Sequence, residues 1–177
     1  RVMTIESSGI VPAAMTARSL MGPLVKGTPG RDHVFTARER HSPTRQNAVG
    51  YPMRAMRTHD FLYIRNYAPD RWPAGDPPGS ADVDASPTRA YMIAHRDDPA
   101  VKRLFDLAFA KRPAEELYDV RRDPDQLHNV AGDPSYRAAR QRMARALDQY
   151  LKETGDPRAL GRGGDFDTYP FWSEAER

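Results

Sequence analysis

The sequence predicts an α+β fold, in which a small antiparallel sheet packs against helices. Two observations indicate this class. The strongest strand signal is a hairpin over residues 53–67, and the most regular helix pattern covers residues 133–155, late in the chain. Few predicted strands alternate with long helices, so a complete parallel α/β fold is not expected within these 177 residues.

The predicted hairpin consists of two extended runs, 53–57 and 61–67, on either side of the turn residues 58–60. Alternate residues of a strand point to opposite faces of a sheet. One face of the second run therefore carries Phe61, Tyr63, Arg65 and Tyr67, and the other carries Leu62, Ile64 and Asn66. Two shorter strands are predicted at 33–38 ("HVFTAR") and 115–120 ("EELYDV").

The closing helix has both a start and a stop signal. Asp133 suits the N-cap, Pro134 suits the first helical position, and Gly155 ends the pattern. An apolar stripe for packing on a sheet is formed by Tyr136, Met143, Leu147, Tyr150 and Leu151.

Three further helices are predicted. The first has Thr16 as its N-cap and ends near Gly22 and Pro23. The second starts with Ser86 as cap and Pro87 in its first turn, after a long loop rich in Pro, Gly and Asp. The third covers residues 99–112, where apolar residues recur at helical spacing.

Composition limits the function classes. The net charge is +3, and a basic chain suits anionic partners such as nucleic acid, anionic lipid or sulfated sugar. The charges are interspersed, however, which favours an ordinary solvated surface, and neither a nucleic-acid nor a membrane partner is predicted. The absence of cysteine excludes disulfides, a thiol nucleophile and a cysteine-based zinc site. The start at Arg1, without a signal-peptide pattern, leads us to expect a chain already in progress.

The sequence predicts no metal site within this chain. Its five histidines have no i, i+4 pairing that would place two ligands on one helix face. The acidic stretches "DVDASP" and "RRDPDQLHN" lack the spacing of a calcium-binding loop.

Glu39, Arg40 and His41 follow the predicted strand 33–38 directly. Ligand groups commonly lie just past strand ends in α/β sheets. An arginine there can pair with an anion, and a histidine can exchange a hydrogen bond with a substrate hydroxyl. The same residues also fit an exposed polar loop without a ligand.

Several stretches resemble the C-terminal region of sulfatases, and most of all the N-sulfoglucosamine sulfohydrolase (heparan N-sulfatase, sulfamidase) branch. They are "YPMRAMRTHDFLYIRNY", "EELYDVRRDPDQLHNVAGDP" and the closing helix through "KETGDP". In addition, "MTARSLM" is similar to the segment that closes the catalytic domain, and "VFTARERHS" to a late strand and active-site loop. The resemblance covers nearly all of residues 10–157.

The resemblance implies the end of an alkaline-phosphatase-like α/β domain, followed by a small antiparallel-sheet subdomain with a packed C-terminal helix. Residues 1–50 would be the tail end of the catalytic domain, 51–155 the C-terminal subdomain and 156–177 a C-terminal tail. It also implies hydrolysis of sulfate from sulfated sugars, of N-sulfoglucosamine type or as O-sulfate esters, in the periplasm or outside the cell. Glu39, Arg40 and His41 would then bind substrate.

The complete enzyme implied by this resemblance uses calcium and a formylglycine made from Cys or Ser in a Cys/Ser-x-Pro-x-Arg motif. The four letters Ser-Pro-Thr-Arg occur twice here, but His41 and Ala85 precede them, and neither can become formylglycine. We therefore expect a fragment that binds neither cofactor, lacks its N-terminal catalytic domain and is inactive alone. The alternatives are a stand-alone module that binds anionic glycans or nucleic acid, with a steep salt dependence, and an inert structural subdomain.

Overall fold

The computed structural model describes residues 20–170 of a chain that divides into two compact units, 1–33 and 34–177. The described part of the first unit contains one short helix, α1 (Met21–Lys26), which ends at Gly27 in a left-handed conformation. The predicted N-cap Thr16 lies outside the described residues. The predicted end at Gly22 and Pro23 is wrong, because both lie in the first turn, where a missing proline N–H breaks no helical bond.

The second unit is built on a four-stranded sheet with the order β1-β2-β3-β4. The strands are β1 (His33–Arg38), β2 (Met53–Thr58), β3 (Phe61–Asn66) and β4 (Glu115–Asp119). β2 and β4 both pair antiparallel with β3. The predicted hairpin is thus confirmed, with a turn one residue shorter than expected, because Thr58 still belongs to β2 and its hydroxyl accepts the Phe61 N–H at 3.0 Å.

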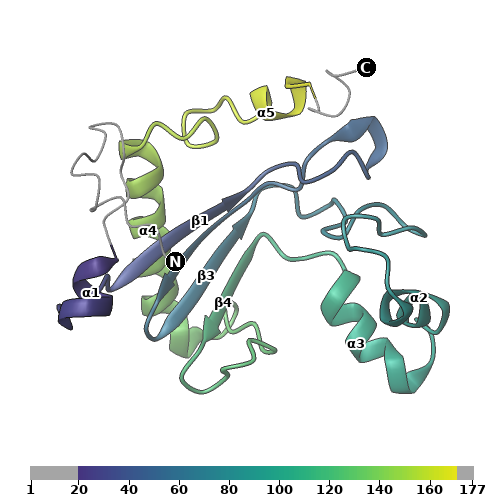
Figure 1. Ribbon diagram of the computed structural model, residues 1–177, viewed down its shortest axis with the longest axis horizontal. Helices are drawn as coiled ribbons and strands as arrows, with labels where there is room; N and C mark the ends of the chain where they lie inside the picture. Colours follow the sequence, from purple (N-terminus) through teal and green to yellow (C-terminus); the bar gives the residue numbers. More distant parts are fainter. Residues whose placement is uncertain (1–19, 171–177) are drawn as a thin grey trace. The chain divides into compact units, whose positions relative to one another are not determined.

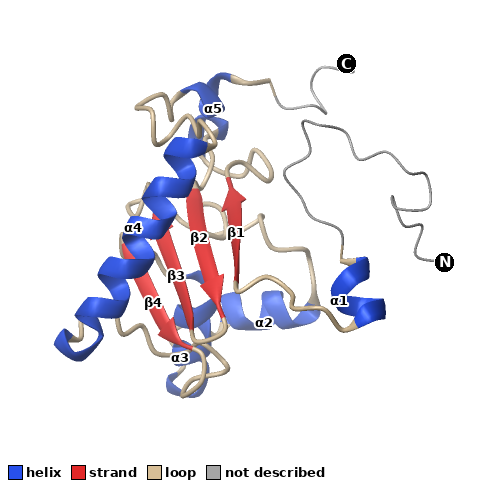
Figure 2. Ribbon diagram, turned by 90° about the vertical axis from the view of Figure 1, so that its left-hand side faces the viewer, coloured by secondary structure: helices blue, strands red, loops and turns tan. Residues whose placement is uncertain are grey.

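Helix α4 (Arg137–Glu153) packs on one face of the sheet, as Figure 2 shows. It follows a 3₁₀ turn, η3 (Pro134–Tyr136), whose Ser135 N–H is capped by the Asp133 carboxylate at 2.8 Å. The core between helix and sheet is formed by Met56, Tyr63, Leu117, Ala131, Met143, Leu147 and Leu151. The predicted apolar stripe is therefore confirmed as the packing face of the closing helix.

The long segment between β3 and β4 carries α2 (Pro87–Ala94) and α3 (Pro99–Phe109). Ser86 caps α2 by accepting the Arg89 N–H at 3.1 Å, which confirms the predicted helix start. α3 ends three residues before the predicted Arg112, because Ala110 adopts an extended backbone. Figures 1 and 2 place α2 and α3 on the side of the sheet opposite α4.

Two short helical turns complete the described elements: η2 (Gln46–Ala48) and α5 (Asp165–Thr168). Every helix within residues 20–170 is too short or too polar to span a bilayer. β1 shares its sheet with β2, so a boundary at residue 50 would lie inside the second unit; the assignment of residues 1–50 to a catalytic domain stays a prediction.

Candidate substrate-binding loop

The three predicted substrate-binding residues begin the segment that joins β1 to β2, residues 39–52, which we call the β1–β2 loop. Its two ends are drawn together by a hydrogen bond from the Tyr51 N–H to the Glu39 carbonyl at 3.0 Å. A Cβ atom at Gly50 would lie 3.0 Å from the Glu39 carbonyl carbon. The close approach of two backbone segments therefore favours glycine at this position.

Glu39 is engaged in a buried ion-pair network. Its carboxylate lies 2.6 Å from Nη2 of Arg158 and 2.7 Å from Nη2 of Arg54. Arg54 in turn contacts Asp156 through Nε at 2.8 Å. Glu39 therefore connects the start of the loop to β2 and to the segment after α4.

The network shifts the pKa values of Arg54 and Asp156 in the direction expected for paired charges. Burial alone would lower the pKa of Arg54, but its hydrogen bonds to Asp156 and Glu39 outweigh burial and raise it. Burial alone would raise the pKa of Asp156, and the Arg54 hydrogen bond holds it below its ordinary value. These contacts give Arg54 a structural role on its strand.

Arg40 and His41 differ in what they contact. Arg40 donates to the carbonyl of Ala48 at 3.1 Å and to the carbonyl of Tyr169. The His41 side chain is exposed, and within residues 20–170 it has no hydrogen bond or ion pair. Of the three predicted residues, His41 is therefore the one whose polar atoms are open to a ligand.

Asp82 holds the middle of the β1–β2 loop. Its carboxylate, with a side chain only 1% exposed, lies 2.5 Å from Nη2 of Arg45 and 2.9 Å from Nη2 of Arg38. It also accepts hydrogen bonds from the hydroxyls of Thr44, at 2.8 Å, and Ser42. Burial would raise the pKa of Asp82, but the hydrogen bonds from Ser42, Thr44 and Arg45 outweigh it and lower the pKa.

The C-terminal part of the chain holds the end of the loop. Asp167 of α5 accepts the Gly50 N–H at 2.9 Å, and its other oxygen lies 3.4 Å from Arg71. Figure 1 shows the segment between α4 and α5 running across the end of the sheet to reach this position. The loop is thus fixed at its start, middle and end by Glu39, Asp82 and Asp167.

Sequence reasoning missed Asp82, Arg158 and Asp167 as partners of this loop. Asp82 belongs to the acidic stretch "DVDASP", which was considered only as a calcium-binding loop. Arg158 and Asp167 belong to the C-terminal tail, which has no recognisable sequence pattern. The arginines of the loop are the signal that could have indicated these partners. An arginine is rarely fully buried unless it is paired, so a buried arginine predicts a carboxylate nearby.

Both Ser-Pro-Thr-Arg copies have structural contacts. In the first, Ser42, Thr44 and Arg45 all bond to Asp82. In the second, Ser86 caps α2, and Arg89 donates to the Val83 carbonyl at 2.9 Å.

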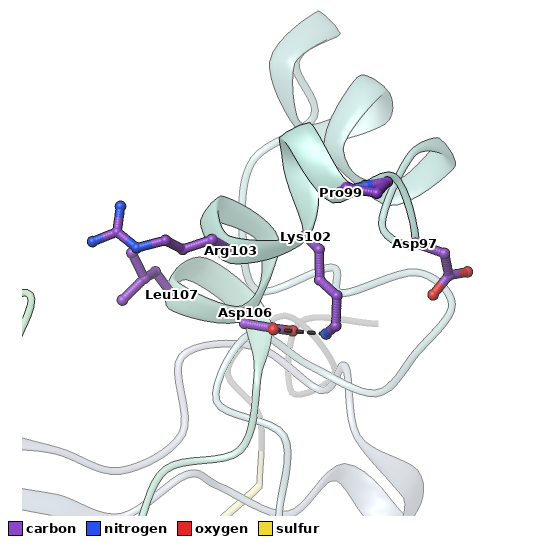
Figure 3. A pocket seen from close by; sticks show the side chains of 6 residues that line it. All are labelled: Asp97, Pro99, Lys102, Arg103, Asp106 and Leu107. Carbon is purple, nitrogen blue, oxygen red and sulfur yellow. Dashed lines mark hydrogen bonds and ion pairs between the residues drawn. The ribbon is translucent and has the colours of Figure 1, made fainter.

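The described residues contain no cluster of three or more His, Asp or Glu side chains able to hold a metal ion. A cavity of about 580 Å³ lies on α3, drawn in Figure 3. Its main polar feature is the Lys102–Asp106 ion pair at 2.7 Å, an i, i+4 contact between exposed side chains. It contains none of the predicted site residues, and its paired charges are typical of a solvated helix face.

No family model matches the chain. The chain is 25% identical over 150 residues to an ulvan-active sulfatase of Formosa agariphila, a match that covers 85% of this chain and 27% of that protein. A second ulvan-active sulfatase of the same organism is 30% identical over 105 residues, covering 59% of this chain and 17% of that protein. These relatives support the sulfatase family for this chain. The chain spans only about a quarter of the first sulfatase's length and less of the second's.

The fold is shared with a solved structure of a protein bound to its substrate, D-glucosamine-2-N,6-O-disulfate. That match has a TM-score of 0.51 and 18% identity, and covers 93% of this chain and 24% of that one. At this identity the likeness shows the fold alone. Together with the antiparallel strands and packed closing helix, it confirms the α+β class predicted for this sulfatase-like chain.

Proposed function

We propose that the chain is the C-terminal part of a sulfatase that removes sulfate from sulfated sugars. The observation that carries this proposal is the sequence match to an ulvan-active sulfatase across 85% of the chain. The match covers 27% of that relative, which supports a partner region outside the chain: the N-terminal catalytic domain. The periplasm or the cell exterior is the location that this proposal favours.

Within such an enzyme, the β1–β2 loop contributes to the substrate pocket. His41 contacts a sugar hydroxyl, because its exposed imidazole can both donate and accept. Glu39 acts by fixing the loop, since its carboxylate is held by Arg54 and Arg158. Arg40 offers a cation to a sulfate or carboxylate, and such binding competes with its bonds to the Ala48 and Tyr169 carbonyls.

The calcium and formylglycine of such an enzyme do not fit the described residues. The positions that would carry the nucleophile are occupied by His41 and Ala85. The neighbouring Ser42 hydroxyl donates to Asp82, and the Ser86 hydroxyl caps the start of α2. The carboxylate of Asp82 is already surrounded by four protein donors. We therefore assign both groups to the catalytic domain and derive no chemical step from this chain.

The proposed substrate is an N-sulfated glucosamine, with an O-sulfate ester of another sugar as the alternative. The protein with the shared fold binds a sugar carrying both kinds of sulfate, so its substrate supports either choice. The residues that would separate the two lie mostly in the catalytic domain under this proposal.

The first experiment is to sequence the coding DNA upstream of Arg1 and to express the complete reading frame. An upstream Cys/Ser-x-Pro-x-Arg motif and release of sulfate from N-sulfated or 6-O-sulfated glucosamine would support the proposal. A start codon with a ribosome-binding site directly before Arg1 would contradict it.

The role of His41 is tested in that complete enzyme. His41→Ala lowers kcat/KM by about tenfold, the effect of losing one substrate hydrogen bond. His59→Ala is the matched control, since His59 is an exposed histidine in the β2–β3 turn. Equal kcat/KM for His41→Ala and the wild type would remove His41 from the pocket.

A further inference from the structure

A cavity of about 390 Å³ is lined by α2, by α3 and by the loop 67–86, which joins β3 to α2 (Figure 1). We call it the aromatic pocket; its lining includes Trp72, Ser80, Ile93, Arg96, Phe105 and Phe109. Its volume lies within the range of small-molecule sites and suits one aromatic ring with a short side chain. The pocket contains none of the residues proposed to bind the sulfated sugar.

The wall of the aromatic pocket is mainly apolar. From α3, Phe105 and Phe109 contribute two stacked rings whose centroids are 5.1 Å apart. Ile93 of α2 and the indole ring of Trp72 add further apolar surface. Because aromatic rings pack well against one another in offset or edge-to-face arrangements, this wall suits a ligand with an aromatic ring.

Two polar side chains of the loop bring unpaired donors to the pocket. Ser80 is 6% exposed, and within the described part of the chain neither its hydroxyl nor the Trp72 indole N–H has a hydrogen bond. The described polar side-chain atoms that are both unpaired and without accessible surface belong to Arg45, Tyr51 and Arg57. The Ser80 hydroxyl and the Trp72 N–H therefore keep accessible surface. Since both residues line the pocket, a ligand oxygen there can accept from them.

Arg96 is the one charged residue among the described residues that line the pocket. Its Nε lies 3.6 Å from Asp97, but these two side chains are 51% and 91% exposed, so the pair is weak. The Arg96 guanidinium donates no hydrogen bond to any other described residue. A second cation lies nearby, because the Lys111 ammonium is 5.2 Å from the centroid of the Trp72 ring. With donors and no acidic side chain in its lining, the pocket favours a ligand that carries a negatively charged acceptor.

We propose that the aromatic pocket binds a small aromatic carboxylate. The ring packs against Phe105 and Phe109, the carboxylate accepts from Arg96, and the Ser80 hydroxyl supplies a further donor. An arginine presents a planar fork of donors that matches a carboxylate. The inference stands apart from sulfate hydrolysis, because it uses neither the β1–β2 loop nor a catalytic domain, and it is tested on the 177-residue chain.

The test uses the chain with Trp172→Phe, which leaves Trp72 as the only tryptophan. The fluorescence of Trp72 is followed during titration with 3-phenylpropionate and, separately, with 3-phenylpropanamide, a neutral molecule of nearly the same shape. We expect a saturable change with the acid and about fivefold or more weaker binding of the amide, because only the acid pairs with Arg96. Sodium acetate, which has the charge without the ring, produces no saturable change.

Two variants in the same background test the polar contacts. Arg96→Gln lowers the affinity for the acid to about that for the amide, and Ser80→Ala weakens acid binding by about threefold or more. Arg103→Gln is the matched control, since Arg103 is an exposed arginine of α3 outside the pocket, and it keeps the preference for the acid. Circular dichroism of each variant checks that the fold is retained.

The proposal is overturned by any of three results. The first is the absence of a saturable change at Trp72 with the acid. The second is equal affinity for the acid and the amide, which would make the pocket a purely apolar contact surface. The third is wild-type affinity for the acid in a folded Arg96→Gln or Ser80→Ala variant.

Discussion

Arg54 Nη2 lies 2.7 Å from Glu39 Oε1 and so connects the second strand of the sheet to the first residue of the β1–β2 loop. The Arg54 side chain is 3% exposed, and the same guanidinium contacts Asp156 beyond the end of α4. One buried cation therefore holds a strand, a loop and the C-terminal segment together. The partners Glu39 and Asp156 would remain close to each other without it, as two partly buried negative charges.

Replacing Arg54 tests how much this cation contributes to the stability of the fold. Arg54→Ala lowers the free energy of unfolding by about 3 kcal/mol, because it removes the buried cation that pairs with Asp156 and leaves Glu39 with Arg158 alone. Urea unfolding followed by circular dichroism measures the change. Arg121→Ala is the control, since Arg121 pairs with Asp60 at the surface, where such a pair contributes about 0–1 kcal/mol. Equal losses for the two variants would show that the Arg54 network is not a main source of stability.

The lowered pKa values of Asp82 and Asp156 make stability depend on pH in the acid range. Both carboxyls have an ordinary value of 3.8 and lie below it in the folded chain. Their contribution is complete above about pH 4 and is lost as the pH falls through the lower folded values. The wild-type urea midpoint therefore decreases below pH 4. Asp82→Asn, which cannot ionise, has a lower urea midpoint than the wild type at pH 6, and its midpoint decreases less as the pH falls below 4. Plots of urea midpoint against pH that run parallel for the two proteins would contradict this prediction.

Local signals were sufficient to predict the main elements of the fold. The hairpin follows from alternation over residues 61–67, and the helix starts follow from Ser86–Pro87 and Asp133–Pro134, where each cap acts on an N–H two or three residues away. Such interactions are encoded within a few residues and do not depend on the rest of the chain. The end of α3 was less predictable, because no glycine or other stop signal marks Ala110.

The contacts that fix the candidate site could not be predicted in this way. Asp82 lies 38 residues from Thr44 along the chain, and Glu39 lies 119 residues from Arg158. Only the folded sheet brings these pairs together, and no local pattern distinguishes Asp82 from the neighbouring exposed Asp84. The positions of Glu39, Arg40 and His41 just past a strand were predictable, whereas the different partners of the three were not.

We expect the truncation of a single side chain in the core between α4 and the sheet to lower stability strongly. Leu147 is fully buried among Met56, Tyr63 and Leu117, so Leu147→Ala costs about 2–5 kcal/mol through lost contacts and a residual cavity. Leu160→Ala removes the same atoms from a side chain that is 51% exposed and costs much less. Thermal unfolding of the two variants measures the difference. Equal midpoints would show that α4 contributes little to the stability of the second unit.

We expect the replacement of Asp167 to loosen the β1–β2 loop without destabilising the rest of the second unit. Its carboxylate accepts the Gly50 N–H at 2.9 Å, and Gly50 lies where the two ends of the loop meet. Asp167→Ala removes this acceptor, so we expect faster hydrogen exchange at the Gly50 amide, by about tenfold or more, as the end of the loop opens more often. The Tyr63 amide, in the central strand β3, serves as the internal reference and keeps its rate. Backbone-resolved NMR exchange measures both amides in one sample. If the Gly50 amide exchanges at the wild-type rate in Asp167→Ala, the loop is held by Glu39 and Asp82 alone; if both amides exchange faster, the substitution has destabilised the whole second unit rather than the loop.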